Sequence, residues 1–222
     1  IKIDGANKKE LGEPSGYGRL EYTYYQMAVD CGIAMMKSHL YADVHFLTQR
    51  FDRDHKGEKI HIHSLCGLLG LDYHNVGSYS YEQYFMVARK LGLGQDALEE
   101  MFRRMVFNVL AHNCDDHTKN FSFQMNRRGV WSLSPAFDLC YSYDSANDWV
   151  NGHNMTINNK RKQITYSDLM VVGEKFNIKR RKKIFEKVKS IMDSFPSFAK
   201  KNKVSLRLRK EVEKNRPRID GE

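Results

Sequence analysis

The chain has 222 residues, of which 41% are hydrophobic, and 36 basic against 27 acidic residues give it a formal net charge of +9. This length and composition predict a globular chain with one large domain or two lobes, and they exclude a disordered chain. No apolar run approaches the roughly 20 residues of a membrane-spanning helix, so we expect no membrane partner.

The cysteines and the N-terminus indicate a cellular compartment. The four cysteines are widely spaced and form no Cys-x-x-Cys pair, which favours free thiols in a reducing cytoplasm over disulfides or structural zinc. The charged residues that follow Ile1 do not resemble a signal peptide. We therefore expect a cytoplasmic protein.

The N-terminal stretch predicts a strand, a loop and a helix. Residues 1–3 alternate like the end of a strand, and the glycine-rich residues 4–18 predict a mobile loop. A helix is predicted over residues 20–32, because Gly32 can end it. Its apolar face consists of Tyr24, Met27, Ala28 and Cys31.

Lys2 and Glu21 allow two interpretations. Glu21 falls in the first turn of the predicted helix, where a carboxylate is stabilised by the helix dipole. Alternatively, a strand Lys followed about twenty residues later by a helix Glu is typical of the kinase ion pair that holds the nucleotide phosphates. The pair alone is a weak signal, and its meaning depends on the motif near Asp115.

The next segment predicts short strands. Residues 33–40 lead into a strand at 45–48, and the charged residues 49–53 fit an ordinary strand end that faces water. His61 and His63 alternate with isoleucines, so both should lie on one strand face, solvated rather than bound to a metal. Two helices are then predicted, over residues 82–88 and 98–112, and the second carries a buried apolar stripe.

Residues 113–140 carry the strongest pattern in the chain. Apolar residues on both sides of Gly129 predict a β-hairpin with one buried face, formed by Phe121, Phe123, Trp131 and Leu133. Asp115 stands five positions before Asn120, and Asp138 follows the hairpin. We therefore expect the hairpin to gather two carboxylates and an amide around one point.

This set fits the chemistry of phosphoryl transfer. In protein kinases an Asp accepts the proton of the substrate hydroxyl, an Asn five residues later holds Mg²⁺, and a later Asp bridges metal and phosphates. Mg²⁺ prefers carboxylate and amide oxygen atoms and keeps some waters, so few protein ligands suffice. Asp116 has the wrong spacing for the base, and we interpret it as a cap or a group that supports the site. The simpler alternative is a surface loop with capping Asp residues.

The C-terminal part is helical and basic. Residues 140–152 predict a loop in the position of a kinase activation segment, followed by a short strand at 155–157. Helices are predicted over 165–176, capped by Thr165 or Ser167, over 178–192, and over a final stretch, 195–217. Between residues 175 and 218 there are 17 Lys and Arg against 4 acidic residues, which indicates either an acidic partner or a solvated helix face.

The stretches 113–123 and 133–139 closely resemble the catalytic core of HipA-like serine/threonine kinases, the toxins of bacterial toxin–antitoxin pairs. The resemblance also covers the succession Ile-Lys, Glu-Tyr and Gly-Ile near the N-terminus and the Arg-Phe-Asp-Arg at 50–53. It implies an ATP- and Mg²⁺-dependent kinase. The resemblance implies that Asp115 is the base, that Asn120 and Asp138 are metal ligands, and that Lys2 and Glu21 form the ion pair. Residues His117 to Asn120, including Lys119, and Phe137 to Cys140 would line the nucleotide phosphates. Gln49 and Phe51 would bind adenine through their backbone, and Asp52 would lie near the ribose.

The same resemblance implies an α+β, protein-kinase-like fold with a truncated small N-lobe and hinge over residues 1–53 and a mostly helical C-lobe over residues 54–222. Kinases carry a Gly-rich loop before the Lys strand, so we expect that loop from preceding residues or from a separate N-lobe polypeptide. The implied partners are a protein substrate with a Ser or Thr acceptor, such as an aminoacyl-tRNA synthetase, and a DNA-binding antitoxin of the HipB type. The basic helices would contact DNA.

Two other classes of function fit parts of the pattern. A metal-dependent phosphohydrolase could use His112, Asp115, Asp116 and His117, although it would need further His-Asp clusters. A catalytically silent binding module would keep the kinase fold without its activity. Nucleotide titration with different divalent metals would separate these alternatives.

Overall fold

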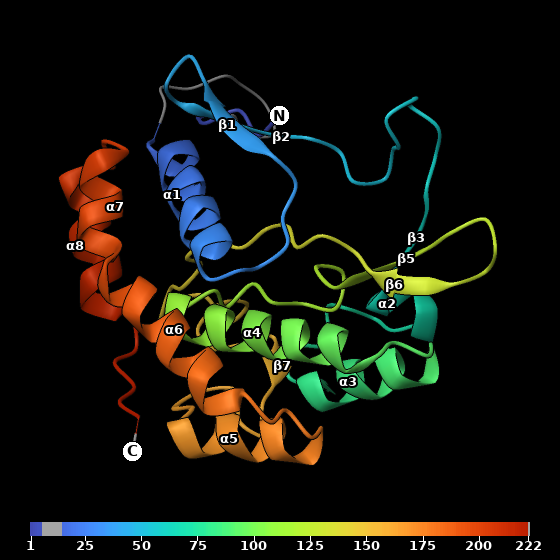
Figure 1. The fold of residues 1–222 in the computed structure, drawn as a ribbon. Coiled ribbons are helices and arrows are strands. Elements are labelled where there is room, and N and C mark those ends of the chain that lie inside the picture. Colours follow the sequence, from blue (N-terminus) through green and yellow to red (C-terminus); the bar gives the residue numbers. More distant parts are fainter. Residues whose placement is uncertain (6–14, 222) are drawn as a thin grey trace.

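The computed structural model describes residues 1–5 and 15–221 of the chain, so most of the predicted N-terminal loop, residues 6–14, lies outside the described residues. Figure 1 shows helices and short strands arranged around the long central helix α4 (Gln95–Ala111). The mixture of helices and small separate sheets confirms the α+β prediction. Within the described residues no helix has the length and apolar character needed to cross a membrane.

The N-terminal part combines helix α1 (Tyr17–Asp30) with the hairpin of β1 (Ser38–Tyr41) and β2 (His45–Thr48). Lys2 pairs with Phe46 through two backbone hydrogen bonds, so the first residues run alongside β2 as predicted for a strand end. Helix α1 begins three residues earlier than expected. Strand β1 was not predicted, because its tight turn uses Ala42 and Asp43 in left-handed conformations instead of glycine.

The predicted hairpin at the centre of the chain is confirmed. It consists of β5 (Ser122–Met125) and β6 (Trp131–Leu133), with Phe123 directly opposite Leu133. Strand β3 (His61–Ser64) adds to the free edge of β5 in antiparallel register, which the sequence did not indicate. The His61 and His63 rings lie 5.0 Å apart on one face, as expected.

Side-chain hydrogen bonds cap the N-termini of several helices that follow β3. Helix α3 (Tyr81–Lys90) starts with a capping box of Ser80 and Gln83, and α5 (Tyr166–Lys175) starts with one of Thr165 and Asp168, which confirms Thr165 as the cap. The short helix α2 (Leu65–Leu69) was not predicted. A two-residue parallel pairing joins β4 (Tyr79–Ser80) to β7 (Met155–Thr156).

The basic C-terminal part contains three helices rather than two. Helix α6 (Arg181–Asp193) is followed by α7 (Phe195–Lys201) and α8 (Leu206–Asn215), so the single last stretch predicted over 195–217 is wrong. The break occurs because Lys203 adopts a left-handed conformation with φ of 55° and Ser205 caps a new helix. In Figure 1, α7 and α8 stand beside α1, and α1 contacts both α6 and α7.

One hydrophobic core joins the two ends of the chain. Buried residues of α1, including Leu20 and Tyr24, belong to the same cluster as Phe107 of α4 and Phe195 of α7. This packing holds α1, and therefore Glu21, in a fixed position above the central helix. It positions the candidate site between the β1–β2 hairpin and the loops that follow α4.

Candidate active site

Lys2, Glu21 and Asp138 meet although they come from distant parts of the chain. Lys2 Nζ lies 2.6 Å from Glu21 Oε1 and also forms an ion pair with the carboxylate of Asp138. Because α1 begins at Tyr17, Glu21 lies beyond the first turn, and the interpretation of Glu21 as a helix-dipole residue is wrong. The structure instead places Glu21 in the predicted pair with Lys2.

The charges of this cluster stabilise one another. Partial burial lowers the pKa of Lys2, but the carboxylates of Glu21 and Asp138 raise it by more, so this pKa lies above its ordinary value. Burial raises the pKa of Glu21, and the ammonium group of Lys2 offsets only part of that effect. Lys2 is therefore a permanent cation near neutral pH, the form that binds phosphate.

Asp138 lies at a backbone bend that is stabilised by hydrogen bonds at Asp138 and at Ala136. Its φ is 54°, a left-handed conformation that is uncommon for residues other than glycine. Its backbone oxygen accepts a hydrogen bond of 3.2 Å from Asn113 Nδ2, and nearby the backbone N–H of Ala136 donates to Ala34 O at 2.8 Å. These contacts fix the direction of the Asp138 carboxylate, which remains 39% exposed.

The loop from Asp115 to Asn120 is closed by one side chain. Asn120 Nδ2 donates a hydrogen bond of 2.8 Å to the backbone oxygen of Asp115, and the Asn120 N–H donates to His117 O at 2.9 Å. This orientation turns the amide nitrogen into the loop and leaves Oδ1 for another contact. The carboxylate of Asp115 remains 41% exposed, as a general base must be to reach a substrate.

Asp116 is buried behind this loop. Its carboxylate accepts hydrogen bonds from Tyr81 Oη at 2.8 Å, from the backbone N–H of Asn154 at 2.6 Å and from His153 Nδ1 at 2.8 Å. The side chain is fully excluded from solvent. Asp116 therefore lies in a buried network behind the loop, and it also lines the small cavity shared by Asn120 and Asp138.

The residues predicted to contact the nucleoside lie where β2 ends. The Gln49 N–H donates to Lys37 O at 3.0 Å, and the carboxylate of Asp52 is held by Arg50 and Arg53 at 2.5 to 2.8 Å. The ring of Phe51 stacks on Phe137, with centroids 5.1 Å apart. Since Phe137 directly precedes Asp138, this stacking links the segment after β2 to the candidate metal ligand.

His117 and Lys119 lie in an aromatic cluster on the Asp115 side. Lys119 Nζ stands 3.6 Å from the centre of the Tyr73 ring, which is a cation–π contact. His117 Nε2 lies 3.7 Å from Asp115 Oδ1, and its ring is 5.8 Å from that of Trp149. The indole N–H of Trp149 itself donates to Asp115 Oδ1 at 2.6 Å.

The donor set at Asn120 and Asp138 fits a magnesium ion. Both residues line one small cavity of about 10 Å³, and Asp138 also lines a neighbouring cavity of about 40 Å³ with Lys2 and Glu21. One amide and one carboxylate oxygen suit Mg²⁺, which usually keeps several waters. The cavities are far smaller than ligand sites of roughly 300–1,000 Å³. Their volumes suit an ion.

The residues proposed for a phosphohydrolase do not form a metal site. Among residues 1–5 and 15–221, no three His, Cys, Asp or Glu side chains are grouped so that they could hold a metal ion. Asp116 is committed to its buried partners, and burial, with the neighbouring His153, lowers the pKa of His112 to about 4. This arrangement disfavours the His–Asp metal chemistry that the alternative requires.

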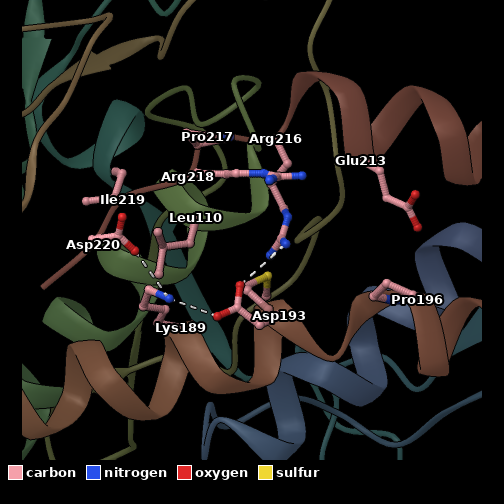
Figure 2. A pocket seen from close by; sticks show the side chains of 11 residues that line it. Leu110, Lys189, Asp193, Pro196, Glu213, Arg216, Pro217, Arg218, Ile219 and Asp220 are labelled. Atoms are coloured by element: carbon pink, nitrogen blue, oxygen red, sulfur yellow. Dashed lines mark hydrogen bonds and ion pairs between the residues drawn. The ribbon is translucent and has the colours of Figure 1, made fainter.

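A cavity of about 700 Å³ lies elsewhere, between α6, α7 and the C-terminal residues. Figure 2 shows Lys189 between Asp193 and Asp220, at 2.9 and 3.6 Å, and Arg216 reaching Asp193 at 3.6 Å. None of the predicted site residues lines it. These ion pairs hold the C-terminal segment against α6, so we assign them a structural role.

Several residues that support the site were not singled out from the sequence. They include Asn113, His153 and Asn154, which are buried, and Trp149, which lies in an irregular segment. The polar pair His153–Asn154, directly before an apolar strand, is the signal that could have indicated a buried polar network. No local pattern indicates that Trp149 reaches Asp115, because their contact spans 34 positions.

Comparison with known proteins places this site in context. The profile of the HipA-like C-terminal domain family matches residues 1–195 of the chain. A protein described as "Putative kinase Y4dM" from Sinorhizobium fredii is 36% identical over 93 residues, which are 41% of this chain and 22% of the relative. A "Putative kinase" from Haemophilus influenzae is 31% identical over 104 residues, covering 42% of this chain and 30% of the relative.

Two solved structures share the fold. HipA of Shewanella oneidensis, solved with HipB and its operator DNA, superposes with a TM-score of 0.66 at 20% identity and covers 88% of this chain. CtkA, a proinflammatory kinase of Helicobacter pylori, gives a TM-score of 0.51 at 14% identity and covers 86% of it. The structural matches cover 52% of the HipA chain and 84% of CtkA. The sequence matches cover less than a third of either curated relative. The kinase-like fold is thereby confirmed.

Proposed function

The chain belongs to the HipA-like C-terminal domain family, and on that premise we propose that it transfers the γ-phosphoryl group of ATP to a Ser or Thr hydroxyl of a cellular protein. The observation that carries the proposal is the meeting of Lys2, Glu21 and Asp138 beside the closed Asp115–Asn120 loop. Phosphoryl transfer depends mainly on positioning and on neutralising charge, and this site offers both.

In this proposal the chain has one cationic contact for the phosphates and one donor set for the metal. Lys2 binds phosphate oxygen atoms, and Glu21 keeps the Lys2 side chain in place. Asn120 Oδ1 and the Asp138 carboxylate would hold Mg²⁺, which would neutralise the phosphate charge. His117 and Lys119 add positive or hydrogen-bonding groups at the phosphate end of the site.

We divide the chain into an N-terminal lobe and hinge, residues 1–53, and a C-lobe, residues 54–222. The nucleoside would lie at the end of β2, in the hinge. Because the Gln49 N–H already donates to Lys37, the Gln49 carbonyl group and the backbone N–H and carbonyl groups of Phe51 are left to contact adenine. Asp52 would reach the ribose with the acceptor position that its three bonds to Arg50 and Arg53 leave open.

Asp115 acts as the general base. A serine or threonine hydroxyl is barely ionised near neutral pH, so accepting its proton as the new bond forms contributes roughly 10²- to 10⁴-fold in rate. The exposed carboxylate of Asp115 and its spacing from Asn120 support this role.

Asp115→Asn tests the proposal because it keeps the shape of the side chain and removes the base. The assay uses the natural polypeptide that contains this chain, together with any separate polypeptide that supplies the phosphate-binding loop. We expect nucleotide affinity to persist while phosphotransfer falls by roughly 10²-fold or more. Transfer at the parent rate would remove Asp115 as base, and nucleotide binding without any transfer by the parent protein would identify a silent binding module.

The partners follow from the same proposal. The Shewanella HipA was solved with HipB and operator DNA, and we propose an antitoxin of that kind for this chain, with growth inhibition through modification of a protein such as an aminoacyl-tRNA synthetase. Exposed Lys and Arg side chains on α6, α7 and α8 are the groups that would contact DNA.

A further inference from the structure

Trp149 contacts the proposed base Asp115, and the proposed function gives Trp149 no role. Trp149 Nε1 donates a hydrogen bond of 2.6 Å to Asp115 Oδ1 from a position 34 residues further along the chain. A bond from N–H to an ionised carboxylate is stronger than a bond between neutral groups. It therefore fixes the rotation of the Asp115 side chain, which the backbone alone would leave free.

Trp149 is itself held in place by Asn154. The Asn154 side-chain nitrogen donates to the backbone oxygen of Trp149 and to that of Cys114, both at 2.9 Å. The backbone N–H of Asn154 donates to the buried Asp116 carboxylate at 2.6 Å. The contacts form a closed ring from Asp116 through Asn154 and Trp149 to Asp115, so the indole is anchored to the same loop that it orients.

Ring packing restricts the indole further. The Trp149 ring lies 6.1 Å from the Tyr73 ring, in an edge-on arrangement, and 5.8 Å from that of His117. These aromatic contacts limit rotation of Trp149 about its side-chain bonds. The donor at Nε1 consequently points in a defined direction.

We propose that Trp149 is a positioning residue for Asp115: it holds Oδ1, so that Oδ2 faces the acceptor hydroxyl and takes its proton. The inference rests on the proposed function, because it assigns a role in orienting the proposed base. Trp149 does not block the carboxylate, since a carboxylate offers about four acceptor positions and the Asp115 side chain remains 41% exposed with the indole in place.

Two substitutions separate orientation from packing. Trp149→Phe keeps an aromatic ring and removes the N–H donor. Trp149→His restores a donor, because an imidazole superimposes on the five-membered ring of indole with Nε2 at the position of Nε1. Trp131 is the other tryptophan of the chain, and Trp131→Phe on β6 is the matched control.

We expect Trp149→Phe to lower kcat for phosphotransfer by about tenfold or more, since small displacements of a catalytic group cost up to about 10²-fold. KM for ATP should stay at the parent value, Trp149→His should recover part of kcat, and Trp131→Phe should match the parent. Parent kcat in Trp149→Phe would overturn the proposal. A higher kcat would also overturn it, by showing that the indole blocks the base. Equal losses in the Phe and His variants would overturn it as well, by assigning Trp149 a packing role only.

A measurement without nucleotide keeps this inference distinct from the proposed function. Trp131→Phe leaves Trp149 as the sole tryptophan of the 222 residues. In this chain Asp115→Asn should shift the fluorescence emission, because it removes the negative charge beside Nε1. An unchanged emission would contradict the hydrogen bond itself. If emission shifts but Asp115→Asn transfers phosphate at the parent rate, the base assignment fails, and the positioning role falls with it.

Discussion

The backbone N–H of Asn154 donates a hydrogen bond of 2.6 Å to the carboxylate of Asp116, although the two residues stand 38 positions apart. The same carboxylate accepts bonds from His153 and Tyr81, and its side chain is fully buried. The pair joins the loop that carries Asp115 to the segment that carries Trp149. Its hydrogen bond therefore ties two segments of the candidate site together.

Asp116→Asn should lower the free energy of unfolding by about 3 kcal/mol, the cost of removing one partner from a buried charged network. The amide cannot accept all three hydrogen bonds of the carboxylate, so at least one buried donor loses its partner. Urea unfolding followed by circular dichroism measures the change. The exposed Asp30 supplies the control, since Asp30→Asn should stay within about 0.5 kcal/mol of the parent. An equal, small effect in both variants would contradict the network.

Asp138→Asn should weaken Mg²⁺–ATP binding by at least about tenfold, or about 1.4 kcal/mol, because Asp138 is the proposed metal ligand. Asp116→Asn should weaken binding far less, because the Asp116 carboxylate lines the same small cavity but is engaged by Tyr81, His153 and Asn154. Calorimetric titration under conditions where both variants are folded compares them directly. Equal losses of affinity would remove Asp138 from the metal site.

His112 should make stability depend on pH below neutrality. Burial lowers the pKa of His112 to about 4 in the folded protein, against 6.5 for the free side chain. Between these values the unfolded chain binds the proton more readily, so this contribution is present above about pH 6.5 and is lost as pH falls toward 4. Its size is on the order of 3 kcal/mol.

The variant His112→Asn removes the titrating group and suits the left-handed conformation at this position, where φ is 54°. We expect the free energy of unfolding of His112→Asn to fall less steeply between pH 6.5 and 4 than that of the parent. His61→Asn, at an exposed histidine, should keep the parent slope. Identical slopes in all three proteins would show that His112 does not titrate as described.

The basic helices should give a steep salt dependence to DNA binding by the complex with an antitoxin. Each phosphate contact that is lost reduces the slope of log K against log salt by about 0.9 for duplex DNA. Combining Lys200→Gln, Lys201→Gln and Lys210→Gln should reduce the slope, while Lys90→Gln on α3 should not. Binding that is unchanged between low and moderate salt would leave these side chains as a solvated helix face.

The sequence by itself was sufficient for features that depend on neighbouring residues. The hairpin around Gly129, the cap at Thr165 and the five-residue spacing from Asp115 to Asn120 all appear in the structure, because turns, caps and short loops are determined by local backbone preferences. The family pattern also paired Lys2 with Glu21 correctly, although residue spacing alone left that pair ambiguous.

Only the tertiary structure decided which distant segments meet. Strand β3 joins β5, Asp116 binds Asn154, and Trp149 reaches Asp115, and none of these contacts leaves a periodic signal in the sequence. Helix boundaries near Lys203 were missed for a related reason, since a left-handed residue can end a helix within an otherwise helical pattern. Buried hydrogen bonds between distant polar groups form only after the core around α4 has brought those groups together, so their partners depend on packing and not on local preference.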